Sequence, residues 1–326
     1  MAPYILGIAN LVYANIFVKC KRKGIAPMTA KPEVLAFFDE PTNTVSYLVW
    51  DPATLEGAVI DPVLNFDQRS GEATVESADA ILAEAKRMGI AIKHVLETHA
   101  HADHLSGAPY IKLKTGARVC IGEHIKDVQR IFRPVFNAQD VSGDGSEFDH
   151  LFKDGEKFKV GEINADVIYT PGHTPACVSY KIGDAVFVGD TMFMPDYGTA
   201  RADFPGGDAG DLYRSIRRIL SLPDESRLFM CHDYKAPGRD RYAWETTVGE
   251  ERAKSVHVHE GVSEEEFVKM REARDSTLAA PLLLLPSIQV NIRAGKFPPA
   301  EANGVHYLKV PVKIVRGQPA TPSSSL

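Results

Sequence analysis

One short stretch of the sequence concentrates side chains that bind metal ions. Residues 98–104 read Thr-His-Ala-His-Ala-Asp-His. In an extended chain, residues two apart point the same way, so His99, His101 and Asp103 can converge on one point. Imidazoles and carboxylates are ligands for first-row metals, and the alanines between them leave room for a tight turn. The spacing therefore indicates a metal site rather than core packing.

Three later segments add ligand-type side chains, each directly after a predicted strand. His173 lies in the segment 170–175, where two prolines and a glycine fix a turn. Asp190 follows a glycine that permits close backbone approach, and His232 follows the apolar run 229–231. Each alone could be an ordinary turn or capping residue. In this order after residues 98–104, they predict one composite site.

Short apolar runs predict the strands that deliver these side chains. The predicted strands are Val45–Trp50, Ala58–Ile60, Ile92–Glu97, Arg118–Ile121, Ala165–Tyr169, Cys177–Ile182, Ala185–Val188 and Arg227–Met230. The predicted helices are Ser77–Met88, Gly107–Lys114, Asp211–Leu220 and Glu264–Asp275, the last as a charged, solvated helix. Residues 140–149 are expected as an exposed loop, and Leu282–Leu285 as core. Two strand-rich halves with helices outside predict an α/β two-sheet sandwich rather than a doubly wound nucleotide fold.

Composition narrows the classes of function. The chain has 326 residues and a net charge of −6, which gives no reason to expect nucleic acid as a partner. It contains neither GxGxxG nor a Walker motif. Four cysteines are widely spread and form no CxxC pair, which favours free thiols in a reducing compartment. We therefore expect a cytoplasmic location.

The N-terminal region differs from the rest. Residues 5–18 are mostly apolar and precede the basic run 19–23, but they are too short for a confident membrane span. Two interpretations stay open, a peripheral membrane anchor or a true start at Met28, and we favour the second. The expected organisation is an extension over 1–32, one domain with a C-terminal extension over 33–320, and a disordered tail over 321–326.

The ordered set of ligand-type residues resembles the metallo-β-lactamase superfamily. The set is His99-x-His101-x-Asp103-His104, His173, Asp190 and His232. The resemblance covers roughly residues 33–256 and implies an αβ/βα sandwich with a metal site at one edge between the sheets. That fold hosts several reactions, so the fold alone does not name one.

The surrounding segments are similar to those of the persulfide dioxygenases, and most similar to their β-lactamase hydrolase-like branch. The segments are 59–63, 98–104, 171–177, 199–204, 232–234 and 247–252. The resemblance implies one Fe(II) held by His99, His173 and Asp190, and oxidation of glutathione persulfide or a related small persulfide by O2 to sulfite and thiol. A homodimer or homotetramer is a further possibility, and a membrane is not expected as a partner.

The resemblance also implies roles for the remaining site residues. His101 joins the metal site, while Asp103, His104 and His232 orient ligands and water. Thr174, Arg201 and Tyr234 are candidates for binding the substrate; Arg201 would pair with a carboxylate or else form a structural salt bridge with Asp203. Cys231 adjoins His232 and is expected on the opposite face as a buried thiol.

A dinuclear hydrolase is the alternative. His99, His101 and His173 would bind one Zn(II), Asp103, His104 and His232 a second, with Asp190 between them, and water would attack a thioester, as in glyoxalase II, or a lactone. The loop 191–198 and the C-terminal region fit glyoxalase II poorly. A metal-free scaffold is the third class. One iron per chain, two zincs or no metal would distinguish the three.

Overall fold

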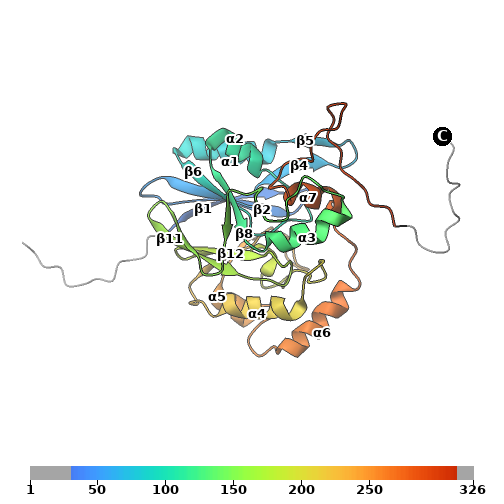
Figure 1. Cartoon of the computed structure of the whole chain (residues 1–326). Helices are drawn as coiled ribbons and strands as arrows, with labels where there is room; N and C mark the ends of the chain where they lie inside the picture. Colours follow the sequence, from blue (N-terminus) through green and yellow to red (C-terminus); the bar gives the residue numbers. More distant parts are fainter. Residues whose placement is uncertain (1–30, 314–326) are drawn as a thin grey trace, which may run out of the picture.

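Two six-stranded sheets stacked face to face form the centre of the computed structural model, which describes residues 31–313 (Figure 1). The first sheet contains, in spatial order, β1 (Glu33–Asp39), β2 (Thr44–Trp50), β3 (Glu56–Ile60), β6 (Ala91–Leu96), β8 (Arg118–Gly122) and β9 (His150–Phe152). The second contains β10 (Lys157–Val160), β11 (Ile163–Tyr169), β12 (Val178–Ile182), β13 (Ala185–Phe187), β14 (Arg227–Phe229) and β15 (Glu245–Thr247). The predicted two-sheet α/β sandwich is confirmed.

Apolar side chains from both sheets fill the space between them. Tyr47 of β2, Leu96 of β6, and Phe187 and Phe229 of the second sheet are almost fully buried in one cluster. The Tyr47 ring lies 5.3 Å from the Phe187 ring and 5.5 Å from the Phe229 ring, measured between centroids. Because strands in the middle of a sandwich are covered on both faces, β2 shows a nearly continuous buried run rather than strict alternation.

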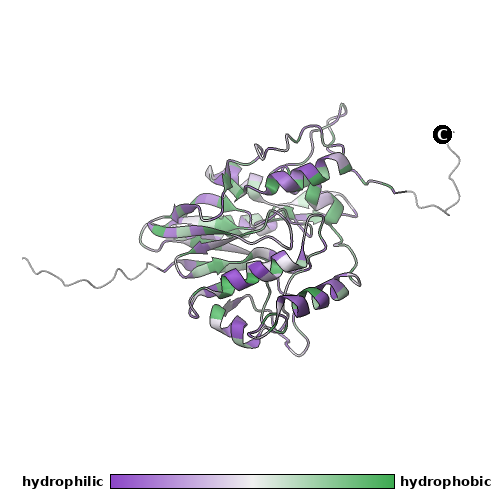
Figure 2. Ribbon diagram, turned by 60° about the horizontal axis from the view of Figure 1, so that its bottom comes forward, coloured by the Kyte–Doolittle hydropathy of each residue, from purple (hydrophilic) through white to green (hydrophobic). Residues whose placement is uncertain are grey.

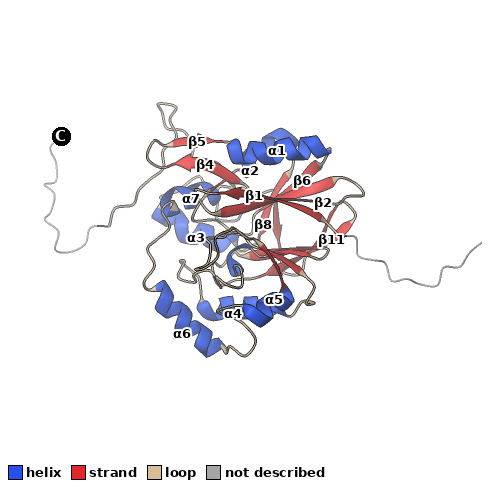
Figure 3. Cartoon of the chain, turned by 180° about the vertical axis from the view of Figure 1, so that it is seen from behind, coloured by secondary structure: helices blue, strands red, loops and turns tan. Residues whose placement is uncertain are grey.

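Helices cover the outer faces (Figure 3). The first sheet carries α1 (Glu76–Met88) and α2 (Ala108–Thr115), and the second carries α4 (Ala209–Leu220), α5 (Val248–Lys254) and α6 (Glu264–Asp275). Along these helices hydrophobic residues recur between hydrophilic ones (Figure 2), as in surface helices with one apolar face and one polar face. Helix α1 ends at Gly89, whose φ of 71° provides the left-handed C-terminal cap.

A smaller sheet and the C-terminal chain border one edge of the sandwich. The small sheet consists of β5 (Glu72–Thr74), β4 (Val63–Asp67) and β7 (Leu105–Ser106). Beside it lie α3 (Ile125–Val135) and α7 (Leu284–Asn291). The Asn291 carboxamide of α7 accepts a hydrogen bond from Ser106 N and donates to the carbonyl oxygens of His101 and His104. Helix α7 therefore supports the loop that follows β6.

Several local predictions were wrong. Helix α6 has the expected solvated face, but its other face buries Phe267, Arg271 and Asp275 against the protein. Leu282 is 83% exposed rather than core. The region after β8 contains α3, which the sequence did not suggest, and residues 140–149 bury Val141 and Phe148 although they form no strand or helix.

None of the helices within residues 31–313 is long and apolar enough to cross a membrane. The expectations for the N-terminal segment up to residue 30 and for the tail 321–326 concern residues outside the described range.

Candidate metal centre

The predicted ligands meet where strand ends from both sheets approach each other. Residues 97–104 follow β6, the His173 loop joins β11 to β12, and Asp190 lies in the short 3-10 turn η1 (Gly189–Thr191) after β13. His232 follows β14 and forms an isolated bridge to Thr44 at the start of β2. All the predicted ligand residues are buried except Asp103, which is partly exposed.

Two histidines and one aspartate form the central group. His99, His173 and Asp190 each offer a ligand atom, and these atoms all lie within 4.8 Å of one another. Asp190 Oδ2 is 3.5 Å from His173 Nε2 and 3.9 Å from His99 Nε2. These separations suit a small cation that sits between the three atoms. They are too long for direct hydrogen bonds to satisfy both imidazoles.

The remaining residues form an adjoining group on the other side of Asp190. Asp190 Oδ1 is 3.3 Å from His232 Nε2, which is also 3.3 Å from Asp103 Oδ2. His101, Asp103 and His104 offer ligand atoms within 4.8 Å of one another. The two oxygens of one carboxylate therefore face two neighbouring sets of ligands.

Buried polar atoms without hydrogen-bond partners gather at this centre. Within residues 31–313 they include His99 Nε2, His101 Nδ1, His104 Nε2, Asp190 Oδ1 and His232 Nε2. Native proteins satisfy most buried polar atoms, and leaving one without a partner costs about 1–3 kcal/mol. So many orphaned atoms directed at one region fit a bound cation, and the donor set of imidazoles and carboxylates fits a first-row metal.

The chain fixes which nitrogen of each imidazole is free. His173 Nδ1 donates to Arg201 O at 2.7 Å, and His232 Nδ1 donates to Asn43 O at 3.1 Å. His104 Nδ1 donates in the same way to its neighbour's carbonyl oxygen at 3.0 Å. Since a carbonyl oxygen can only accept, each of these rings presents Nε2 to the centre.

His99 is oriented by its neighbour. The Thr98 hydroxyl donates to Asp61 Oδ2 at 2.8 Å, so its oxygen accepts from His99 Nδ1 at 3.0 Å. Burial, together with neighbouring histidines, holds the pKa of His99 well below 6.5. The same causes lower the pKa of His104 to about 4. Neutral rings are the form that binds metal.

Two buried acidic residues, Asp61 and Glu97, lie beside His101. Asp61 accepts hydrogen bonds from Thr98 N at 2.7 Å and lies 3.0 Å from His101 Nε2. Glu97 Oε2 lies 3.5 Å from the same nitrogen, and its other oxygen accepts from Ser106. Burial alone would lower the pKa of His101, but Asp61 and Glu97 raise it well above 6.5. His101 thus turns Nε2 to the acids and Nδ1 to the centre.

Asp61 and Glu97 were not assigned roles from the sequence, although an acid directly after an apolar strand was a usable signal. Cys231 needs a correction. It is buried as expected, but its Sγ faces the site, 3.6 Å from Asp61 Oδ2 and within 4.8 Å of ligand atoms of His101 and His232. Strand alternation failed there because β14 ends at Phe229.

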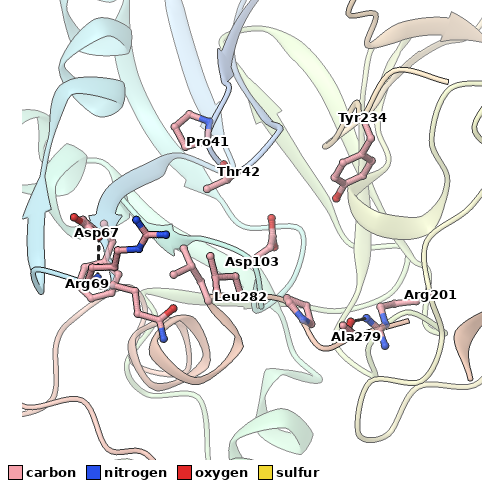
Figure 4. A pocket seen from close by; sticks show the side chains of 13 residues that line it. Pro41, Thr42, Asp67, Arg69, Asp103, Arg201, Tyr234, Ala279 and Leu282 are labelled. Atoms are coloured by element: carbon pink, nitrogen blue, oxygen red, sulfur yellow. Dashed lines mark hydrogen bonds between the residues drawn. The ribbon is translucent and has the colours of Figure 1, made fainter. Parts of the chain in front are cut away.

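Asp103 remains ionised. Burial would raise its pKa, but electrostatic interaction with the imidazoles of His232 and His104 outweighs burial and lowers the pKa to about 2. Asp103 also lines a cavity of about 860 Å³ (Figure 4). Among the predicted ligand residues, Asp103 alone lines this cavity. The lining residues are Pro41, Thr42, Phe66, Asp67, Gln68, Arg69, Asp103, Arg201, Tyr234, Ala279, Pro281, Leu282 and Leu283.

The three substrate-binding candidates lie in different environments. Tyr234 lines the cavity, and its ring stacks on His232 at 5.6 Å between centroids. Arg201 also lines the cavity, but its guanidinium forms two hydrogen bonds to Asp203, at 2.5 and 2.7 Å. Thr174 is fully buried, with its hydroxyl 3.1 Å from Cys177 Sγ. Thr174 therefore supports the His173 loop and does not line this cavity.

Comparisons with known proteins agree with the geometry. The model of the metallo-beta-lactamase superfamily matches residues 39–232. A probable metallo-hydrolase of Burkholderia pseudomallei is 50% identical over 294 residues, covering 86% of this chain and 99% of the relative. The beta-lactamase hydrolase-like protein of Agrobacterium fabrum is 51% identical, covering 88% of this chain; the chain spans only 66% of that relative.

More distant similarity extends to persulfide dioxygenases. The human mitochondrial persulfide dioxygenase ETHE1 is 29% identical over 269 residues, which is 81% of this chain and 89% of that protein. The crystal structure of ETHE1 from Myxococcus xanthus superposes with a TM-score of 0.64 at 30% identity, covering 81% of this chain and 100% of that one. The resemblance inferred from the ordered histidines and aspartates is confirmed, and the chain belongs to the metallo-β-lactamase superfamily.

Proposed function

We propose that this chain is a non-haem Fe(II) dioxygenase that oxidises glutathione persulfide, or a related small persulfide, to sulfite and the parent thiol. The observation that carries the proposal is the convergence of His99, His173 and Asp190 on one point, next to a second group of which Asp103 lines a cavity. Two neutral imidazoles and one carboxylate are the ligand set of non-haem iron oxygenases, and they leave coordination positions open. The similarity to ETHE1 proteins over most of the chain supports this reaction.

Fe(II) bound there would supply open coordination positions and the redox chemistry that sulfur oxygenation needs. The chain's own groups orient the ligands and contact the substrate. Arg201 O and the Thr98 hydroxyl hold His173 and His99 with Nε2 facing inward. The ionised Asp103 faces the cavity, where it can accept a hydrogen bond from the water that the reaction consumes. The overall reaction balances as RSS⁻ + O2 + H2O → RSH + SO3²⁻ + H⁺.

Oxygen uptake tests the proposal. Protein loaded anaerobically with Fe(II) should consume O2 on addition of glutathione persulfide and release one sulfite per O2, measured with an oxygen electrode and a sulfite assay. Zn(II)-loaded protein should show no uptake, because zinc has no redox chemistry. The variant His173→Ala should lose uptake, whereas Lys157→Ala, an exposed change on β10, should retain it. Absence of uptake in fully iron-loaded protein would reject the oxygenase.

A dinuclear zinc hydrolase is the second candidate, favoured by a specific observation. Asp190 directs Oδ2 at His173 and His99 and Oδ1 at His232, so it could bridge two ions. The names of the two relatives at about 50% identity described above also point to hydrolases. Two tightly bound zincs per chain, with fast cleavage of a glutathione thioester or a lactone, would favour this candidate over the oxygenase.

A further inference from the structure

Two arginines, Arg69 and Arg201, line the cavity, and within residues 31–313 only Arg201 of the two forms a salt bridge with an acidic residue. Figure 4 shows Arg69 and Arg201 on opposite sides of Asp103. The Arg201 guanidinium is neutralised by Asp203 and donates a further bond to Ala279 O at 2.7 Å. The Arg69 guanidinium has neither an acidic partner within 4.0 Å nor a hydrogen bond in the part of the chain that the structure describes. Of the two arginines, Arg69 is therefore the one whose guanidinium is free of direct ion pairs with the described residues and can contact a ligand.

The backbone that carries Arg69 is well anchored. Arg69 lies in the turn between β4 and β5, where its N–H donates to Asp67 Oδ1 at 2.8 Å and Gly71 N donates to Asp67 O at 2.8 Å. The preceding strand is fixed by Asn65, whose side-chain amide donates to Asp39 Oδ1 at 3.0 Å and Ser77 Oγ at 2.9 Å. The turn thus fixes the backbone of Arg69, whereas its side chain is exposed. The same turn contains the acid Asp67, whose pKa is lowered by hydrogen bonds from Arg69 N and Ser70 and, to a smaller extent, by the Arg69 charge.

Apolar surface lies between Arg69 and the metal centre. Phe66 and Leu282 line the cavity together with prolines, and Leu282 is 83% exposed. Leu282 and Phe66 therefore contribute apolar surface to the cavity wall. A ligand that reaches from Asp103 to the β4–β5 turn would present its middle to this surface and its far end to Arg69.

The geometry points to Arg69 as the receptor for an anionic group of the substrate, a carboxylate set several bonds away from the reacting sulfur. This inference rests on the proposed function and narrows its substrate class to acidic thiol compounds. A guanidinium is suited to this role because it stays charged and offers paired N–H donors to a carboxylate. Arg201, the candidate predicted from the sequence, already donates hydrogen bonds to Asp203 and to Ala279 O within the protein.

The inference is tested by changing the ligand's carboxylates and residue 69 separately and together, and comparing the binding affinities. Glutathione and glutathione diethyl ester, which lacks both carboxylate charges, are titrated into the anaerobic Fe(II)-loaded full chain by calorimetry. The wild-type protein should bind glutathione more tightly than the diester. Arg69→Ala should reduce that preference about tenfold, as expected for loss of one partly exposed charge-assisted bond. Arg69→Lys should retain part of the preference.

The matched control is Arg87→Ala, because Arg87 is exposed on α1 and does not line the cavity. This control should leave both affinities unchanged. Equal weakening of both ligands by Arg69→Ala, or no change in either, would overturn the inference, as would a wild-type protein without preference between them. Because binding is measured without turnover, failure of the oxygen-uptake experiment would leave this result interpretable.

Discussion

Helix α6 lies outside the metal centre, yet we predict that Asp275 controls metal affinity through the loop 199–202. Asp275 Oδ2 accepts from Ala202 N at 2.8 Å. Its other oxygen bonds Arg271, which is fully buried and donates to Thr199 O at 3.0 Å. Between these two anchors, Arg201 O accepts from His173 Nδ1. The ion pair on α6 thus sets the position of the carbonyl that orients a metal ligand.

Asp275→Ala should have two separate effects. It leaves the buried Arg271 charge without its partner, so the free energy of unfolding should fall by about 3–5 kcal/mol. It also frees Ala202 N and the adjoining Arg201 carbonyl, so affinity for Zn(II) or Co(II) should fall about 10- to 100-fold. Denaturant unfolding measures the first effect, and competition with a chromophoric chelator measures the second.

A paired variant separates stability from positioning. Arg271→Met with Asp275→Leu removes both charges and keeps apolar volume, which should restore much of the lost stability. It cannot restore the bonds to Thr199 O and Ala202 N, so metal affinity should stay low. Glu272→Ala, an exposed change on the same helix, should alter neither quantity. Wild-type metal affinity in folded Asp275→Ala protein would refute the reasoning.

Three further predictions concern the acids and the metal. Burial raises the pKa of Glu251 from 4.5 to about 8. The folded state therefore holds this proton more tightly, and stability falls as pH rises from about 4.5 to 8, by up to about 5 kcal/mol. Glu251→Gln should reduce this fall of stability with pH, which thermal unfolding at several pH values measures. An unchanged dependence of Tm on pH would exclude Glu251 as its cause. Asp61→Asn removes the charge beside His101 and should weaken metal binding about tenfold or more by chelator competition, with little change in circular dichroism. Removing the metal with a chelator should lower Tm by about 8 °C or more. The reason is that a metal present at about 1,000 times its Kd contributes about 4 kcal/mol to stability. Equal Tm values with and without chelator would contradict a stabilising contribution from the metal.

The ligands could be predicted because each one stands in a local pattern. His99 lies in a contiguous motif directly after a strand, and His173 lies in a turn fixed by prolines and glycine. Strand ends at one edge of a sandwich are brought together by the fold, so local signals were sufficient to predict that these residues converge. The family resemblance supplied their order along the chain.

Features that depend on pairing between distant residues could not be predicted. Helix α6 appears solvated in sequence because Arg271 and Asp275 are charged, and only the structure shows that they neutralise each other when buried. Arg201 could have faced either a ligand or Asp203, a choice between two rotamers that sequence does not encode. The cavity wall comes from a hairpin turn and from residues 279–283, which have no periodic pattern.

The arrangement around His232 distinguishes the two candidate reactions. Its Nδ1 donates to Asn43 O, so Nε2 faces Asp103 Oδ2 and Asp190 Oδ1, each at 3.3 Å. An imidazole nitrogen and two carboxylate oxygens that face one another form a ligand set for a cation. A dinuclear centre would use this position for its second metal, whereas a single metal at His99, His173 and Asp190 would not.

Calorimetric titration with Zn(II) can count the binding events at the centre. We expect His232→Ala to abolish the second binding event, because the variant lacks one ligand of the second set. Binding at His99, His173 and Asp190 should remain. A second event that persists in the variant would show that His232 does not control whether the centre holds one metal or two.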